Sequence, residues 1–282
     1  MYKNLVLVDG EIMPAEEAAV SVHDRGHQFG DGVFEIVPVY NGRCFALLPH
    51  MDNLFESVIK VKIPAVYTIE ELIEFHEALI AESGIENGEI YTQITRGTAD
   101  YGLAFPEMSV PQLTMTIVET DREVLAAKRE SGVNIITTED NRWQLCNVNT
   151  LNRLPEVLAR QKARESNAFD TLFIRENGKI TESTESSFMV IKDEMIWTHP
   201  DNNLVHKNIT RRLIKERLAP DIPSPSCLQP LPVSKTEAAA ALENTPLPAT
   251  APRSLQTAIN QRYGPPAPKP YSPMYRRQKQ ST

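Results

Sequence analysis

Hydrophobic and polar residues follow two different periods along the first 120 residues. Short β-branched and apolar runs predict strands near residues 4–8, 33–40, 43–48, 89–95 and 112–118. The Asp9-Gly10 and Asn41-Gly42 dipeptides are typical of two-residue hairpin turns. Apolar residues at helical spacing over 51–59 and 72–80 predict two helices that cover the sheet. This pattern predicts a first α+β lobe that ends near residue 120.

A second lobe with more β structure follows. Its predicted elements are a charged helix at 122–130, a strand at 133–137, a helix through 154–158, strands at 171–175, 187–192 and 195–198, and a helix from 210 to about 218. The Asn177-Gly178 dipeptide predicts a hairpin, and Thr210 is a suitable N-cap for the last helix.

The composition changes abruptly after Pro220. Residues 220–282 hold 13 of the 21 prolines and a single glycine, Gly264. Such a segment buries too little apolar surface to fold, so it is predicted to be a disordered or divergent tail. The predicted domains are therefore 1–120, 121–219 and 220–282, and a tail translated out of frame is the alternative interpretation.

Charge and cysteine content narrow the class of protein. The chain has 29 basic and 37 acidic residues, a net charge of -8, and no basic block, which disfavours a nucleic-acid partner. No run of 18 apolar residues exists and the chain starts with a strand-like segment, which predicts a cytoplasmic protein without a membrane partner. Cys44, Cys146 and Cys227 are too few and too widely spaced for a disulfide framework or a metal site.

Six short motifs stand in a fixed order along residues 1–218. They are DRGHQFGDGVFE at 24–35, TRGT at 95–98, RWQLC at 142–146, ITES at 180–183, THP at 198–200 and ITR at 209–211. Together they resemble the class IV aminotransferases of PLP fold type IV, and most closely the D-amino acid transaminases. The resemblance implies a two-domain α+β or α/β fold whose second, β-barrel-like domain is left incomplete by the tail. It also implies a homodimer that transfers amino groups between amino acids and 2-oxo acids.

The cofactor of that family is pyridoxal 5′-phosphate, an electron sink that needs three kinds of protein group. These are a partner for the ring nitrogen, an anion site for the phosphate, and a lysine that forms a Schiff base and moves the substrate proton. The resemblance assigns the ring nitrogen to Glu182 and the phosphate to Ile209 and Thr210 at a helix N-terminus. Glu185 and Ser186 belong to the same cofactor cup, where Glu185 replaces a small hydroxyl residue and brings a like charge near the phosphate.

The chain departs from the family at the positions that carry the chemistry. Asn149 stands where the family has the Schiff-base lysine, and Asn53 where it has the arginine that binds the phosphate. An amide has no nucleophilic amine and no useful pKa, so Asn149 is not competent for either task of the lysine. Phe34, Tyr101 and Leu103 occupy the places of residues that bind the substrate carboxylate. The sequence therefore predicts weak, non-covalent cofactor binding, if any, and impaired catalysis.

Several interpretations of these departures stay open. Another amine could replace the missing lysine, and the candidates are Lys162, Lys179, Lys192 and Lys207. The chain could instead be a non-catalytic dimeric relative that acts by binding or regulation, or a damaged copy of an ordinary enzyme. The apolar substrate side would also suit a branched-chain aminotransferase or an aminodeoxychorismate lyase, which need the same lysine.

Overall fold

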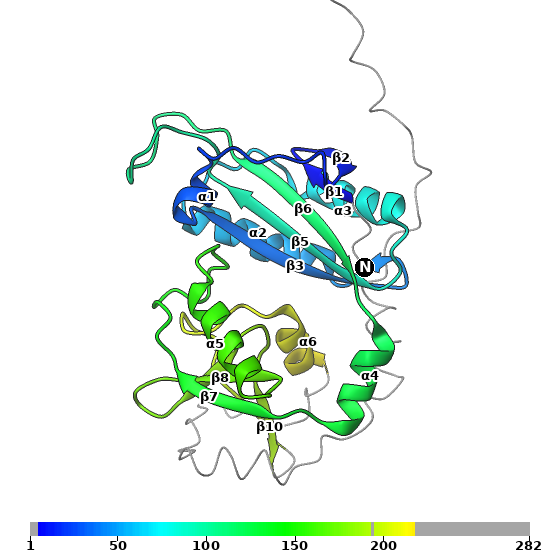
Figure 1. The fold of residues 1–282 in the computed structure, drawn as a ribbon, viewed down its shortest axis with the longest axis vertical. Helices are drawn as coiled ribbons and strands as arrows, with labels where there is room; N and C mark the ends of the chain where they lie inside the picture. Colours follow the sequence, from blue (N-terminus) through cyan, green and yellow to red (C-terminus); the bar gives the residue numbers. More distant parts are fainter. Residues whose placement is uncertain (1–4, 193–194, 218–282) are drawn as a thin grey trace, which may run out of the picture. The chain divides into compact units, whose positions relative to one another are not determined.

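The structure is a computed structural model that describes residues 5–192 and 195–217. The predicted tail and Cys227 lie outside the described residues. The first sheet has the strand order β2-β1-β6-β5-β3-β4, and its neighbouring strands are antiparallel (Figure 1). Its strands are β1 (Leu5–Val8), β2 (Glu11–Pro14), β3 (Gly32–Tyr40), β4 (Arg43–Cys44), β5 (Gly88–Thr95) and β6 (Gln112–Glu119).

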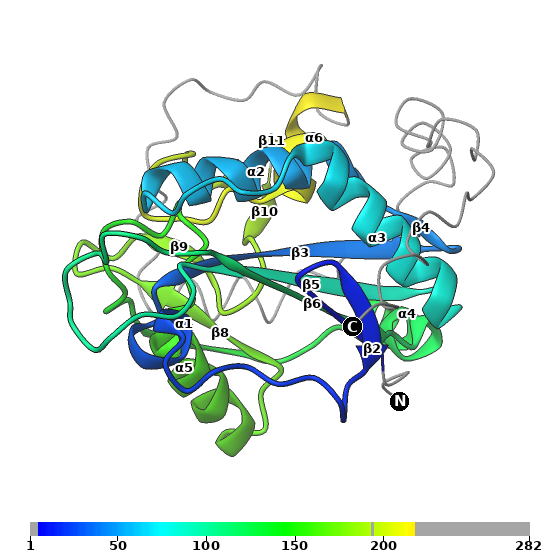
Figure 2. The same ribbon diagram turned by 90° about the horizontal axis from the view of Figure 1, so that it is seen from above.

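Two helices cover one face of this sheet, as predicted. Helices α2 (Leu47–Lys60) and α3 (Ile69–Ser83) lie along the same side of β3, β5 and β6 (Figure 2). Buried residues such as Leu54, Leu79 and Met115 fill the space between the layers. A capping box formed by Thr68 and Glu71 fixes the start of α3 by pairing two backbone N–H groups with side chains.

The predicted turns are confirmed, but one predicted strand is wrong beyond residue 44. Asp9 and Gly10 join β1 to β2, and Asn41 and Gly42 join β3 to β4, all four with positive φ. The strand expected over 43–48 ends at 44 because Ala46 adopts the left-handed conformation, with φ of 49°, and α2 begins at the next residue. A short helix, α1 (Arg25–Phe29), was not predicted.

The rest of the chain alternates helices and short sheets. Its elements are α4 (Arg122–Ser131), β7 (Ile135–Glu139), α5 (Leu154–Glu165), β8 (Asp170–Ile174), β9 (Ile180–Ser183), β10 (Met189–Lys192), β11 (Met195–Thr198) and α6 (Ile209–Arg217). Strands β7 and β8 are parallel and are joined through α5, whereas β9 adds to β8 antiparallel. Strands β10 and β11 form a separate hairpin. The predicted domain boundary falls between β6 and α4 and stays a prediction.

Two details of the second half differ from the sequence expectation. Asn208, not Thr210, caps α6, because its Oδ1 accepts a hydrogen bond from the backbone N–H of Arg211 at 2.7 Å. The apolar residues expected to mark the buried face of α5 are exposed; Glu156, Ala159 and Ala163 are buried instead. No helix in the described ranges is long and apolar enough to cross a membrane.

Candidate active site

A buried carboxylate, Glu35 on β3, collects three side-chain donors. His50 Nδ1 lies 2.9 Å from Glu35 Oε1, while Asn53 Nδ2 and Asn149 Nδ2 donate to Oε2 at 2.6 and 3.1 Å. All four residues are buried, so the hydrogen bonds replace those that water would otherwise make. Asn53 and Asn149, which the sequence resemblance predicts to replace an arginine and a lysine, therefore share one acceptor atom.

The backbone holds Asn149 in this position. Phe34 N–H donates to the carbonyl of Asn149 at 2.8 Å, and Leu151 N–H donates to the carbonyl of Gly32 at 3.1 Å. This short antiparallel contact ties residues 149–151 to the start of β3, next to Glu35. The Asn149 Oδ1 atom is buried and has no hydrogen-bond partner among the described residues.

Glu182 on β9 is a second buried carboxylate, only 2% exposed. Arg142 Nη1 and His206 Nδ1 each lie 2.7 Å from its Oε1, and the backbone N–H of His206 is 3.1 Å from both oxygens. Burial by itself would raise the pKa of Glu182, but the hydrogen bond and charge of His206 and the charge of Arg142 hold the pKa below its usual range. Glu182 is therefore ionised and already hydrogen-bonded on both oxygens.

A network of buried charges supports Glu182. Arg142 binds Asp140 through two nitrogens at 3.0 and 3.1 Å and lies 3.7 Å from Glu156 Oε1. Arg175 Nε adds an ion pair to Asp140 at 2.9 Å. Burial alone would raise the pKa of Asp140. The hydrogen bonds and the charge of Arg142 outweigh the effect of burial, so the pKa of Asp140 is lowered.

The two carboxylate clusters meet at residues 206 and 207. Asn53 Nδ2 approaches the carbonyl of Lys207 at 3.5 Å, and His206 is the residue bound to Glu182. Helix α6 begins two residues later with Ile209, whose buried side chain packs against Ala46. Thr210, the predicted phosphate-binding residue, is exposed in the first turn of the same helix. A helix N-terminus is a favourable place for an anion.

Other predicted cofactor and substrate residues lie in different surroundings. Ser186 closes a tight turn by hydrogen bonds with Ser183, whereas Glu185 is largely exposed and lies 3.8 Å from Arg153. Phe34 is buried and stacks on Tyr91, with ring centroids 5.4 Å apart.

Tyr101 and Leu103 are each 80% exposed, so the described structure does not bring them to Phe34. They belong to a loop, residues 101–110, whose base is held firmly. Arg25 donates to the carbonyls of Gly102 and Leu103 at 2.6 and 3.3 Å. Arg96 lies 3.8 Å from the ring centroid of Phe105, and both arginines also bind Asp31.

The alternative amines are engaged away from Asn149 where the structure describes them. Lys207 Nζ pairs with Glu56, and Lys162 Nζ donates to Thr138 Oγ1 at 3.2 Å. The Lys179 side chain has no described contact with Glu35 or Glu182, and the side chain of Lys192 lies outside the described part of the structure. The amines of Lys162 and Lys207 would have to leave their present partners to reach the site.

These residues fit part of a pyridoxal phosphate site and fail at its covalent centre. Glu182 offers an ionised carboxylate and α6 offers a helix N-terminus, which suit a ring nitrogen and a phosphate. However, Arg142 and His206 already occupy the Glu182 oxygens, and Asn149 carries an amide that is bonded to Glu35. The site does not fit a cofactor bound through a lysine.

The fold and motifs agree with known proteins. Residues 32–225 match the amino-transferase class IV family. The chain is 41% identical over 212 residues to a D-alanine aminotransferase of Staphylococcus epidermidis, covering 74% of each chain. It is 38% identical over 211 residues to one of Listeria monocytogenes, covering 74% of this chain and 72% of the relative. The chain therefore belongs to the class IV aminotransferases, a family that depends on pyridoxal phosphate, and the predicted resemblance is confirmed.

Solved structures support the fold. A branched-chain amino acid aminotransferase from Escherichia coli superposes with a TM-score of 0.69 at 22% identity, covering 77% of this chain and 73% of the other. A hypothetical aminotransferase from Mycobacterium tuberculosis, in its PLP-bound form, gives 0.65 at 20% identity, covering 75% and 76%. At these identities the likeness concerns the fold alone, and it confirms PLP fold type IV.

Sequence reasoning missed several residues of the site. Glu35 is the last residue of the motif at 24–35 and His50 stands three positions before Asn53, yet neither was assigned a role. His206 has no sequence signal, because the loop after β11 must fold back before its ring reaches Glu182. Asp140, Arg142 and Glu182 carry opposite charges, but a buried network of these residues could be predicted only if β7 and β9 were known to belong to the same sheet.

Proposed function

We propose that this chain keeps the scaffold of a D-alanine aminotransferase but transfers amino groups poorly or not at all. The observation that carries the proposal is the pair of amides on Glu35: Asn53 and Asn149 take the places of an arginine and a lysine and bind one carboxylate oxygen. Neither amide can form a Schiff base or move a proton. Loss of a general base alone lowers rates by roughly 10² to 10⁴.

The same site supports weak, non-covalent binding of pyridoxal 5′-phosphate. Ionised Glu182 and the N-terminus of α6 favour the ring nitrogen and the phosphate. Asn53 lacks the charge of the family's arginine, and loss of a hydrogen bond of that kind costs about 1.5–3 kcal/mol. Glu185 adds a negative charge in the turn after β9. Amino acids and 2-oxo acids are the proposed substrates of any remaining activity.

The decisive experiment looks for a covalent link to the cofactor. The full chain is purified with pyridoxal phosphate, its visible absorbance is recorded, and borohydride treatment is followed by mass spectrometry of the peptides. Transfer from D-alanine to 2-oxoglutarate is measured in parallel, with the Staphylococcus epidermidis enzyme as the positive control. We expect no reduced adduct on any lysine and negligible transfer. An adduct on Lys207 or another lysine, with turnover near that of the control, would contradict the proposal.

We further propose that the chain acts as a homodimer in the cytoplasm. The exposed apolar loop supports the dimer: Tyr101 and Leu103 are 80% exposed and Met108 is 89% exposed. Apolar side chains gathered in this way mark interaction surfaces more often than free surface. Sedimentation velocity should give a dimer that the substitution Met108→Asp weakens, whereas Glu107→Asp should leave it unchanged. A monomer at all concentrations would refute the dimer.

A further inference from the structure

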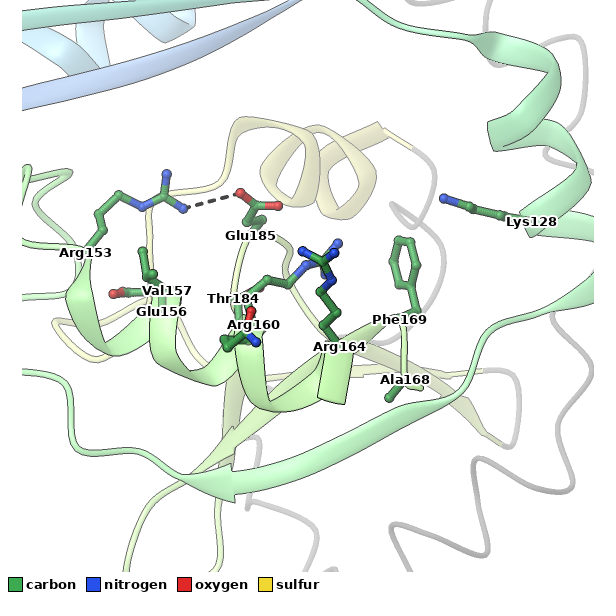
Figure 3. Close-up of a pocket in the computed structure, with 11 residues that line it drawn as sticks. Lys128, Arg153, Glu156, Val157, Arg160, Arg164, Ala168, Phe169, Thr184 and Glu185 are labelled. Carbon is green, nitrogen blue, oxygen red and sulfur yellow. Dashed lines mark ion pairs between the residues drawn. The ribbon is translucent and has the colours of Figure 1, made fainter. Parts of the chain in front are cut away.

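A cavity of about 710 Å³ lies beside helix α5, and neither Glu35 nor Glu182 lines it (Figure 3). Its charged lining residues are Lys128, Arg153, Glu156, Arg160, Arg164 and Glu185. Four basic residues thus face two acidic ones, in a chain whose net charge is -8. The cavity concentrates positive charge that the rest of the molecule does not share, which favours an anionic ligand.

Two arginines on α5 form the centre of this charge. Arg160 and Arg164 stand one helical turn apart, and both side chains line the cavity (Figure 3). Like charges at this spacing destabilise a helix. Arg160 pairs with Asp170 at 3.2 Å, whereas Arg164 has no ion pair among the described residues. The pair therefore carries more positive charge than its described neighbours neutralise.

Phe169 holds two of the cations in place without neutralising them. Lys128 Nζ lies 5.1 Å and Arg160 Cζ 5.0 Å from the centroid of its ring. Contacts of this kind orient a cation by attraction to the ring face and leave its charge available. An anion entering the cavity would meet donors that are already positioned.

Arg153 supplies a further cation from the N-cap position, immediately before the same helix. Its guanidinium carbon lies 4.8 Å from the centroid of the Phe34 ring, and its Nη2 is 3.8 Å from Glu185 Oε1. Arg153 is partly buried and Glu185 is largely exposed, and an ion pair of this length contributes little, so it opens readily for a ligand. Its Nε atom is buried without a hydrogen-bond partner in the described part of the chain.

We propose that this cavity binds a small phosphate ester, with Arg160 and Arg164 as the principal ligands of the phosphate. The planar donor fork of arginine matches phosphate oxygens, and a dianion neutralises two guanidinium groups at once. A volume of about 710 Å³ is ample for a small organic molecule. Glu185, one of the residues assigned to the cofactor cup, lines this cavity, whereas Glu182, Ile209 and Thr210 do not. The inference does not rest on the proposed function, because its phosphate ligands, Arg160 and Arg164, belong to no part of the proposed cofactor site.

Isothermal titration calorimetry of the full chain tests the proposal with glycerol 3-phosphate, inorganic phosphate and glutarate as probes. We expect glycerol 3-phosphate to bind more tightly than glutarate, and added salt to weaken it. Arg164→Gln should raise its Kd roughly tenfold. Arg212→Gln, which changes an exposed arginine of α6 outside the cavity, should leave the Kd unchanged.

Four results would overturn the proposal. They are no binding of millimolar glycerol 3-phosphate, tighter binding of glutarate, equal weakening by Arg164→Gln and Arg212→Gln, or a loss on Thr210→Ala as large as that on Arg164→Gln. The last would place the phosphate at the N-terminus of α6. Far-UV circular dichroism of each variant checks that the fold is retained. Binding of inorganic phosphate as tight as that of glycerol 3-phosphate would show that the organic group contributes nothing, and would overturn the proposal that the ligand is a phosphate ester.

Discussion

Replacing Arg142 by methionine should destabilise the fold more than any surface substitution. The Arg142 side chain is 2% exposed and is the cation shared by Asp140, Glu182 and, more distantly, Glu156. Removing one partner of a buried ion pair leaves uncompensated charge and costs about 3–5 kcal/mol. His206 keeps its ring and backbone contacts to Glu182, and Arg175 keeps its ion pair with Asp140, which places the expected loss at the lower end of that range.

Urea unfolding followed by far-UV circular dichroism measures this loss. Arg142→Lys keeps the charge but loses the paired hydrogen bonds to Asp140, so its cost should be intermediate, roughly 1–3 kcal/mol. Arg212→Met is the matched control, because Arg212 is about half exposed and its ion pair with Glu216 is long, at 3.9 Å. Its effect should stay within about 0.5 kcal/mol. A loss for Arg142→Met no larger than that of the control would refute the reasoning.

The same variant has a predictable dependence on pH. The pKa values of Asp140 and Glu182 are lowered in the folded protein, from ordinary values of 3.8 and 4.5. Groups of this kind stabilise the fold above their ordinary pKa and lose that contribution as the pH falls. The difference in unfolding free energy between the natural chain and Arg142→Met should therefore be largest near neutral pH and shrink below about pH 4.5.

Three further predictions concern other parts of the chain. Burial lowers the pKa of His76 from 6.5 to about 4, so the free energy of unfolding should fall by roughly 3 kcal/mol as the pH decreases from 6.5 to 4. Urea unfolding at several pH values should show a weaker pH dependence for His76→Gln than for the natural chain. Gly97→Ala should cost more in thermal unfolding than Gly178→Ala, because both have positive φ but only the Cβ at 97 would overlap the Val110 carbonyl oxygen. Asn149→Lys alone should restore little transfer from D-alanine, because Asn53 is also altered and effects within one site are coupled; a fully active variant would show that Asn53 is harmless.

The sequence predicted the helices and strands well where the apolar pattern extended over many residues and a turn dipeptide marked its end. Helices α2 and α3 and strands β3, β5 and β6 lie within a few residues of their predicted positions. It failed at residue 45 because the apolar run continues across a backbone reversal at Ala46, and apolar periodicity does not report φ. It also failed on α5, whose apolar residues are exposed beside a cavity that only the three-dimensional arrangement defines.

For the candidate site, too, the sequence predicted some features and could not predict others. The resemblance predicted site roles for Glu182, Asn53 and Asn149, since short motifs with fixed spacing carry the family pattern, and these roles stay predictions. Their mutual geometry could not be predicted, because Asn53 and Asn149 are 96 positions apart and meet only through Glu35. The contact of His206 with Glu182 depends on a loop whose path no local pattern specifies.

The loop of residues 101–110 is shaped before any partner arrives. Arg25 and Arg96 both bind Asp31; Arg25 donates to the carbonyls of Gly102 and Leu103, and Arg96 lies over the Phe105 ring, so this part of the loop is held when the domain folds. Fixing the backbone of a residue costs about 1–2 kcal/mol of conformational entropy. Here that cost is part of the folding free energy and does not weaken the association with a partner. In the proposed homodimer, association through Tyr101, Leu103 and Met108 would therefore resemble the docking of two rigid bodies, with fast and shape-selective recognition. A substitution of Asp31 that removes its ion pairs with Arg25 and Arg96 should slow formation of the proposed dimer, although Asp31 is not one of the proposed contact residues.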